Sequence, residues 1–99
     1  MAHIIVVEDE ADLQSVLEYN LKQAGHTVSV AGRGQEGLRL AQQQKPDLVL
    51  LDLMLPDISG TEVCRTLKSN ADTRSIPVVM VTARGEEIDR VVGFEIGAD

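Results

Sequence analysis

The sequence predicts an α/β domain built around a parallel sheet with helices on both faces. Four short apolar runs recur along the 99 residues, and stretches with a helical spacing of apolar residues lie between them. Strands that alternate with helices in this way pair in parallel through right-handed crossovers. Because three of the runs are apolar throughout, both faces of the sheet must be covered. We therefore expect a doubly wound, three-layer fold.

The four apolar runs are the expected strands, and they lie at residues 4–7, 27–31, 48–51 and 78–81. The first, third and fourth runs are continuous and rich in aliphatic side chains, which is typical of strands that are buried on both faces. The second run alternates, with Thr27 and Ser29 on one side. Such alternation indicates a strand nearer an edge of the sheet.

Four segments carry apolar residues at helical spacing: Leu13, Val16, Leu17, Leu21 and Ala24 in the first, Leu38, Leu40 and Ala41 in the second, Val63, Leu67 and Ala71 in the third, and Ile88, Val91, Val92 and Ile96 in the fourth. The first helix is expected to end at Gly25 and the fourth at Gly97, because glycine commonly follows a helix. The second is expected to be short and to end before Pro46. The third is expected to begin after Ser59 and Gly60.

Charge and composition exclude several classes of function for this segment. With 16 acidic residues against 9 Lys and Arg, the formal net charge is −7, and its field repels nucleic acids and anionic membranes. The single cysteine, Cys64, can form neither an internal disulfide nor a cysteine-rich zinc site. The apolar run near the N-terminus stops at Glu8 and has no basic leader. We therefore expect no signal peptide and no membrane span, and a cytoplasmic location.

Three acidic residues follow expected strands directly. Glu8 and Asp9 follow the first strand, and Asp52 follows the third. Because the carboxyl ends of parallel strands meet at one edge of a sheet, we expect the three carboxylates to lie together. Their mutual repulsion raises their pKa values or attracts a cation, and an all-oxygen site favours Mg²⁺. Alternatively, acids near residue 9 merely favour the start of the first helix, but that explanation does not extend to Asp52.

Thr82 comes directly after the fourth run, at the same expected edge, and the small Ala83 follows it. A hydroxyl there can donate a hydrogen bond to a phosphoryl oxygen, and a small neighbour leaves room beside it. The alternative is that Thr82 is only a favourable strand residue. Its place beside three acids favours the first interpretation.

Three motifs together resemble the receiver domain of two-component response regulators. They read VVEDE at residues 6–10, LLDLMLPDISG at residues 50–60 and VMVTAR at residues 79–84. The resemblance covers the whole chain, in order. It implies a flavodoxin-like sheet with strand order 2-1-3-4, the fifth strand and fifth helix of the family being absent. It also implies a phosphorylation-controlled switch rather than an enzyme that acts on metabolites.

The resemblance assigns a role to each candidate site residue. Asp52 is the expected phosphoacceptor, which takes a phosphoryl group from a phosphohistidine of a sensor kinase. Glu8, Asp9, Asp52 and the backbone carbonyl of Met54 are the expected Mg²⁺ ligands. Thr82 is the expected switch hydroxyl, and Ala83 the residue that gives the phosphoryl group access.

The segment that follows Ala83 resembles the class of response regulators whose output is a winged-helix DNA-binding domain. The expected partners are thus a sensor histidine kinase and such an output domain. The family continues past Asp99 with a fifth strand, a lysine followed by proline, and a fifth helix, so we expect a C-terminally incomplete receiver domain over residues 1–99. Lys45-Pro46 does not replace that pair, because it precedes the third strand at the opposite edge. An uncovered fourth strand predicts a homodimer, or an exchange of the fourth strand or fourth helix. Because the family's lysine, which pairs with the acceptor and contacts the phosphoryl group, is missing, we also expect weakened phosphoryl transfer.

Two other functions stay open from the sequence. Residues 32–37 read G-x-G-x-x-G after a strand, with Asp52 further along the chain, as in a dinucleotide-binding fingerprint. That interpretation places Gly32, Gly34 and Gly37 at a pyrophosphate but gives the acids and Thr82 no role. The other alternative is a pseudo-receiver that binds proteins without phosphorylation, since a fold alone does not determine function.

Overall fold

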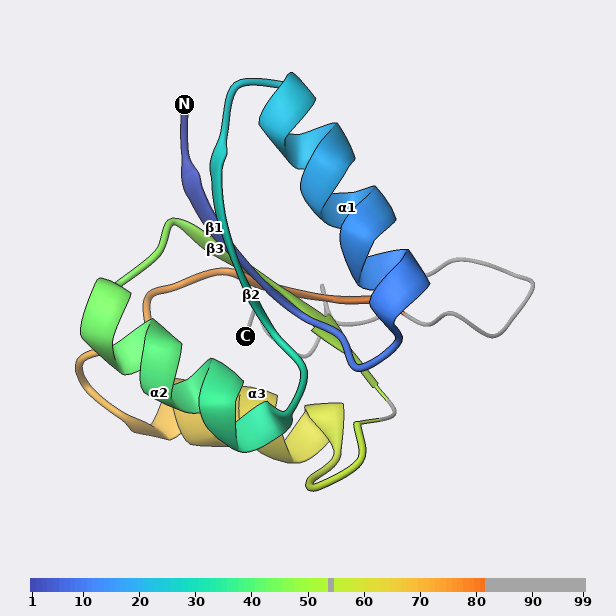
Figure 1. Cartoon of the computed structure of the whole chain (residues 1–99). Helices are drawn as coiled ribbons and strands as arrows, with labels where there is room; N and C mark the ends of the chain where they lie inside the picture. The colour runs from blue at the N-terminus through green and yellow to red at the C-terminus, as the bar shows by residue number, and fades with distance from the viewer. Residues whose placement is uncertain (54, 82–99) are drawn as a thin grey trace.

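The computed structural model describes residues 1–53 and 55–81, and in this part strands and helices alternate strictly (Figure 1). The elements are β1 (His3–Val7), α1 (Ala11–Gln23), β2 (Thr27–Ala31), α2 (Gly34–Gln44), β3 (Leu48–Asp52), α3 (Gly60–Ser69) and β4 (Val78–Val81). The four expected strands are confirmed. The fourth predicted helix lies outside the described residues.

The four strands form one parallel sheet in the order β2-β1-β3-β4. This is the strand order that the resemblance implies. In the register of the sheet, Val7 at the end of β1 lies opposite both Ala31 and Leu51. Asp52 lies opposite Val81. The four strands therefore end at one edge, and the residues that follow β1 and β3 start from neighbouring positions.

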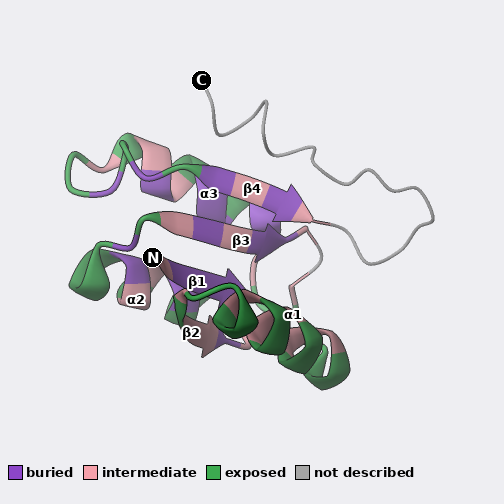
Figure 2. Ribbon diagram, turned by 90° about the horizontal axis from the view of Figure 1, so that it is seen from above, coloured by how far each residue is buried: buried purple, intermediate pink, exposed green. Residues whose placement is uncertain are grey.

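Helices lie on both sides of this sheet, which confirms the doubly wound arrangement (Figures 1 and 2). Helix α1 covers one side, and α2 and α3 cover the other. The main core lies under α2 and α3, where alternate strand residues meet buried residues of the two helices. Its fully buried members include Ile5, Leu51, Met80, Val63 and Leu67. The strand β2, at one end of the sheet, is the least buried, as its alternating sequence predicts.

The helices differ from the expected ones in three places, two of them at a helix boundary. Helix α2 begins at Gly34 and is longer than its apolar residues indicate. In α1, Val16 is 53% exposed, because it lies at the margin of the face that Leu13 and Leu17 turn toward the sheet. Helix α3 ends at Ser69, so that Ala71 is exposed in the following turn. Asn70 causes this turn by accepting the backbone N–H of Asp72 with its side chain.

Two glycines allow α2 to lie close to its neighbours. A Cβ atom at Gly37 would come within 2.6 Å of Val7 Cγ2, and one at Gly34 within 2.6 Å of Ile58 Cγ1. Side chains at these positions would therefore push α2 away from the sheet and from the loop before α3. Among the described helices, none has the length and apolar character needed to cross a membrane.

Candidate metal centre

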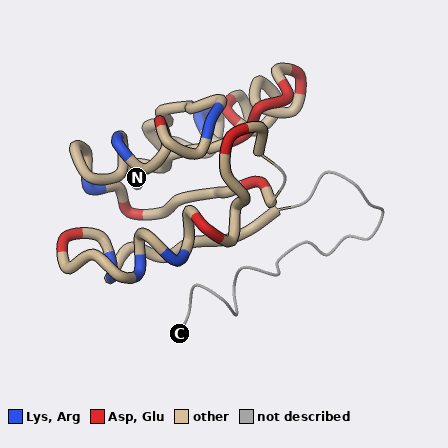
Figure 3. Tube along the Cα trace, turned by 90° about the horizontal axis from the view of Figure 1, so that it is seen from below, with Lys and Arg blue, Asp and Glu red and all other residues tan. Residues whose placement is uncertain are grey.

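The acidic residues predicted to gather do so at the carboxyl edge of the sheet. Glu8 follows β1 directly, Asp9 follows it, and Asp52 is the last residue of β3. Carboxylate oxygens of the three residues lie within 4.8 Å of one another. Figure 3 shows acidic segments gathered at this edge. We refer to Glu8, Asp9 and Asp52 as the acid cluster.

The members of the acid cluster differ in their contact with solvent. Glu8 is 4% exposed and Asp52 is 6% exposed, whereas Asp9 is exposed. Burial raises the pKa of Glu8 to about 7, and repulsion from Asp52 and Asp9 adds to this effect, although the backbone N–H of Glu10 opposes it. At neutral pH the cluster therefore holds a carboxyl group that ionises only at a cost, unless a cation is bound.

Hydrogen bonds fix the position of Glu8. Its side chain accepts the backbone N–H of Glu10 at 2.9 Å, and its own N–H donates to the carbonyl of Ala31 at 2.9 Å. The amide of Gln14, in the first part of α1, donates to the carbonyl of Glu8 at 2.8 Å. Gln14 was not predicted as a site residue, and its one signal in the sequence is that it shares the inner face of α1 with Leu13 and Leu17. The Glu8 carboxylate is thus held toward the cluster.

The backbone that carries Asp52 packs against Gly60. The N–H of Gly60 donates to the carbonyl of Leu53 at 2.9 Å, and a Cβ atom at position 60 would lie 2.8 Å from Leu53 Cα. A larger residue at Gly60 would therefore displace the chain next to Asp52. Helix α3 begins at Gly60, with Ser59 accepting the N–H of Glu62 as its N-cap.

A cleft of about 360 Å³ opens beside the acid cluster, lined by Asp9, Leu53, Leu55, Pro56, Asp57, Ile58 and Ser59. One wall is the loop between β3 and α3. In this loop, Asp57 accepts backbone N–H groups of Gly34 and Gln35 at the start of α2, at 2.8 Å and 3.0 Å. No local pattern predicts this contact, because it joins positions far apart in the chain.

The same contact argues against the dinucleotide-binding alternative. In that fingerprint, the N–H groups at the helix start hold a pyrophosphate. Here the N–H groups of Gly34 and Gln35 donate to the negatively charged Asp57 instead. Gly34 and Gly37 are accounted for by close packing against Ile58 and Val7. The glycine-rich segment thus joins α2 tightly to the sheet.

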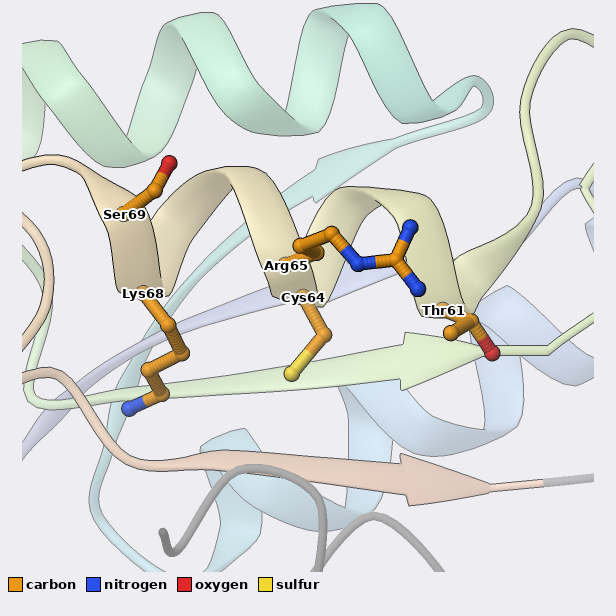
Figure 4. Close-up of a pocket in the computed structure, with 5 residues that line it drawn as sticks. All are labelled: Thr61, Cys64, Arg65, Lys68 and Ser69. Carbon is orange, nitrogen blue, oxygen red and sulfur yellow. The ribbon is translucent and has the colours of Figure 1, made fainter.

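A second hollow lies along α3, and none of its lining residues belongs to the acid cluster. Its lining residues are Thr61, Cys64, Arg65, Lys68 and Ser69 (Figure 4). The Lys68 amine donates to the carbonyls of Arg74 and Ile76, at 3.1 Å and 2.7 Å, and Arg65 pairs with Glu62 at 3.0 Å. These cations therefore support the helix and the turn that follows it.

Three predicted site residues, Met54, Thr82 and Ala83, lie outside the described residues. The described part of the chain thus brings together the three carboxylates of the prediction. These can supply a hard cation with an all-oxygen coordination set. Asp9 is the exposed member of the three, and it also lines the cleft beside them.

Comparisons with known proteins agree with this geometry. A family model described as the response regulator receiver domain matches residues 4–99. Among curated relatives, the phosphate regulon transcriptional regulatory protein PhoB of Rhizobium meliloti is 48% identical over 96 residues, which are 97% of this chain and 42% of that protein. The chain spans about two fifths of the length of the curated relatives that it matches.

Solved structures share the fold. A response regulator from Chloroflexus aurantiacus superposes with a TM-score of 0.86 at 32% identity, covering 99% of this chain and 80% of that one. The receiver domain of sensor histidine kinase PA1611 from Pseudomonas aeruginosa, with a magnesium ion in its active-site cleft, gives 0.80 at 30% identity, covering 84% and 68%. The chain belongs to the response regulator receiver domain family.

Proposed function

Because the chain is a response regulator receiver domain, we propose that it is a phosphoacceptor switch with Asp52 as the acceptor. The proposal rests above all on one observation: the carboxylates of Glu8, Asp9 and Asp52 lie within 4.8 Å of one another at the carboxyl edge of the sheet. In the transfer, a carboxylate oxygen of Asp52 forms a bond to phosphorus, and the phosphorus–nitrogen bond of a kinase phosphohistidine breaks. The products are an acyl phosphate and a free imidazole.

The donor set of the acid cluster fits Mg²⁺. Glu8, Asp9, Asp52 and the backbone carbonyl of Met54 are the proposed ligands, since Mg²⁺ prefers carboxylate and carbonyl oxygens together with water. Glu8 is almost fully buried, which raises its pKa, and a bound cation would stabilise its ionised form. When bound, the ion neutralises negative charge that builds up on the phosphoryl oxygens. The magnesium ion in the Pseudomonas relative supports the same assignment.

Two residues after β4 complete the proposed site. Val81, the last residue of β4, lies opposite Asp52 in the sheet, and Thr82 and Ala83 follow it in the chain. The Thr82 hydroxyl donates a hydrogen bond to a phosphoryl oxygen, and the small Ala83 leaves room for the group. Phosphorylation then shifts the chain between two states of the surface that follows β4.

The partners follow from the same function. Residues 1–99 act as one receiver domain in the cytoplasm, which takes its phosphoryl group from a sensor histidine kinase. The transcriptional relatives support an output domain of the winged-helix, DNA-binding class. With a net charge of −7, the receiver segment itself contacts neither DNA nor a membrane. Its chemistry is confined to its own phosphorylation and dephosphorylation.

The test is to treat the protein with Mg²⁺ and acetyl phosphate and to measure a hydroxylamine-labile phosphoryl adduct. We expect the adduct in the unmodified protein and its loss in Asp52→Asn. Asp12→Asn is the matched control, because Asp12 is an exposed acid of α1 outside the acid cluster, and this variant should keep the adduct. An adduct that survives in Asp52→Asn would refute the assignment. A protein that forms no adduct and does not bind Mg²⁺ would favour the pseudo-receiver alternative.

A further inference from the structure

One carboxylate fastens the loop between β3 and α3 to the start of α2. The two oxygens of Asp57 accept separate backbone N–H groups, Oδ1 that of Gly34 at 2.8 Å and Oδ2 that of Gln35 at 3.0 Å. These hydrogen bonds, that of Gln35 above all, hold the pKa of Asp57 below its usual value. A negative charge at the first N–H groups of a helix is also stabilised by the helix dipole. Asp57 thus joins its loop to two residues that lie 23 and 22 positions earlier in the chain.

Packing around this contact leaves little space for the loop to move. Gly34 is buried, and a Cβ atom there would lie 2.6 Å from Ile58 Cγ1 and 2.9 Å from Val63 Cγ2. The start of α2 therefore touches both the loop and α3. At its ends, the loop is closed by the hydrogen bond from the N–H of Gly60 to the carbonyl of Leu53. Asp57 supplies a further attachment, between these ends.

The fastened loop forms one side of the proposed site. Leu53 follows Asp52 directly, and the cleft beside the acid cluster is bounded by Asp9 on one side and by the loop residues, Asp57 among them, on the other. A change in the position of the loop would therefore change the shape of this cleft. It would also move the backbone after Asp52, which is where the proposed function places a carbonyl ligand.

We propose that Asp57 is a positioning residue for metal binding and phosphoryl transfer. By tying the loop to α2, it holds the backbone that follows Asp52 in the geometry that the metal requires. This inference rests on the proposed function and adds to it a residue outside the acid cluster. Residues that orient metal ligands commonly change metal affinity about tenfold or more when they are replaced, and we expect an effect of about tenfold from loss of the Asp57 side chain.

The experiment compares Asp57→Ala and Asp57→Asn with Asp47→Ala. Asp47 is a suitable control, because it is also exposed and also accepts a backbone N–H, that of His3 at 2.8 Å, but it precedes β3 at the opposite edge of the sheet. The dissociation constant for Mg²⁺ and the rate of phosphorylation by acetyl phosphate are measured on folded protein. Asp57→Ala should weaken Mg²⁺ binding about tenfold and slow phosphorylation. For Asp57→Asn, the dissociation constant and the rate should lie between those of Asp57→Ala and those of the unmodified protein. For Asp47→Ala, both should stay within about twofold of the values for the unmodified protein.

A merely structural Asp57 would lower the free energy of unfolding without changing Mg²⁺ affinity of the folded protein. If Asp57→Ala stays within about twofold in both measurements while the unmodified protein is phosphorylated at Asp52, the positioning role is wrong and the proposed function stands. If the unmodified protein neither binds Mg²⁺ nor forms the adduct, both are wrong. Should Asp57→Ala fail to fold, Asp57→Asn against Asp47→Asn decides by the same criterion.

Discussion

Glu8 shows, at the scale of a single side chain, what the acid cluster requires. Its carboxyl group is almost fully buried beside Asp52 and Asp9, and burial followed by their repulsion raises its pKa to about 7. Such a group is stabilised by a proton at low pH and by a divalent cation at higher pH. Without a metal, protonation of Glu8 is therefore coupled to folding.

The metal-free protein should lose stability as the pH rises from about 4.5 to about 7. The pKa of Glu8 is 4.5 in its ordinary state and about 7 when folded, so the folded chain binds the proton more tightly. This contribution is complete below pH 4.5 and is lost as the pH rises through 7. Urea unfolding in the presence of a chelator measures the effect. Glu8→Gln should flatten the pH dependence in this window, and an unchanged slope would show that another group is responsible.

Magnesium should stabilise the protein, and more strongly above pH 7 than below it, because only ionised carboxylates bind the ion well. At a free Mg²⁺ concentration of 100 times the dissociation constant, the expected gain in unfolding free energy is about 2.7 kcal/mol. Thermal unfolding with and without Mg²⁺ measures this gain. Glu8→Ala and Asp9→Ala should each remove most of it, whereas Asp12→Ala should retain it. If Mg²⁺ raised the unfolding free energy equally in all variants, the ion would bind outside the acid cluster.

The residues of the site differ in how far the sequence could predict them. Glu8, Asp9 and Asp52 were predictable, because each follows or ends an apolar run and parallel strands end together. Asp57 and Gln14 were not, since their partners are set by how α2 and α1 pack and not by local spacing. Met54, Thr82 and Ala83 remain predictions.

At the scale of the elements, the strands were easier to predict than the helices. Three strands were predicted from continuous apolar runs and the second from its alternating sequence, and all four were confirmed. The helix α2 was underestimated, because its first turn consists of Gly34, Gln35 and Glu36, which carry no apolar signal. The end of α3 depends on a polar turn at Asn70, which the apolar spacing of Val63, Leu67 and Ala71 does not reveal.

The close approach of α2 to β1 can be tested with two glycines. Gly37→Ala should lower the unfolding free energy by about 1–3 kcal/mol, because its Cβ atom would lie 2.6 Å from Val7 Cγ2 in a packed core. Gly32→Ala is the control, since a Cβ atom there meets nothing within 4 Å. Urea unfolding compares the two variants. Similar stability of both would contradict the tight contact between α2 and β1.

At the scale of the whole molecule, the described sheet ends at β4. Among residues 1–53 and 55–81, β4 pairs with β3 alone, and its sequence from Val78 to Val81 is entirely apolar. Apolar edge strands favour pairing with another chain. We therefore predict that β4 pairs with a second copy of the chain as the protein concentration rises. Sedimentation equilibrium tests this prediction, and a stable monomer at high concentration would contradict it.

Mapping of the modified residue tests most directly whether Asp52 is the phosphoacceptor of a magnesium-dependent site. The protein is treated with acetyl phosphate, in Mg²⁺ or in a chelator, and the acyl phosphate is then reduced with borohydride, which converts the modified aspartate to homoserine. Peptide mass spectrometry should find the conversion at position 52 with Mg²⁺ and should find almost none with the chelator. Conversion at another aspartate, or equal conversion without Mg²⁺, would contradict the account.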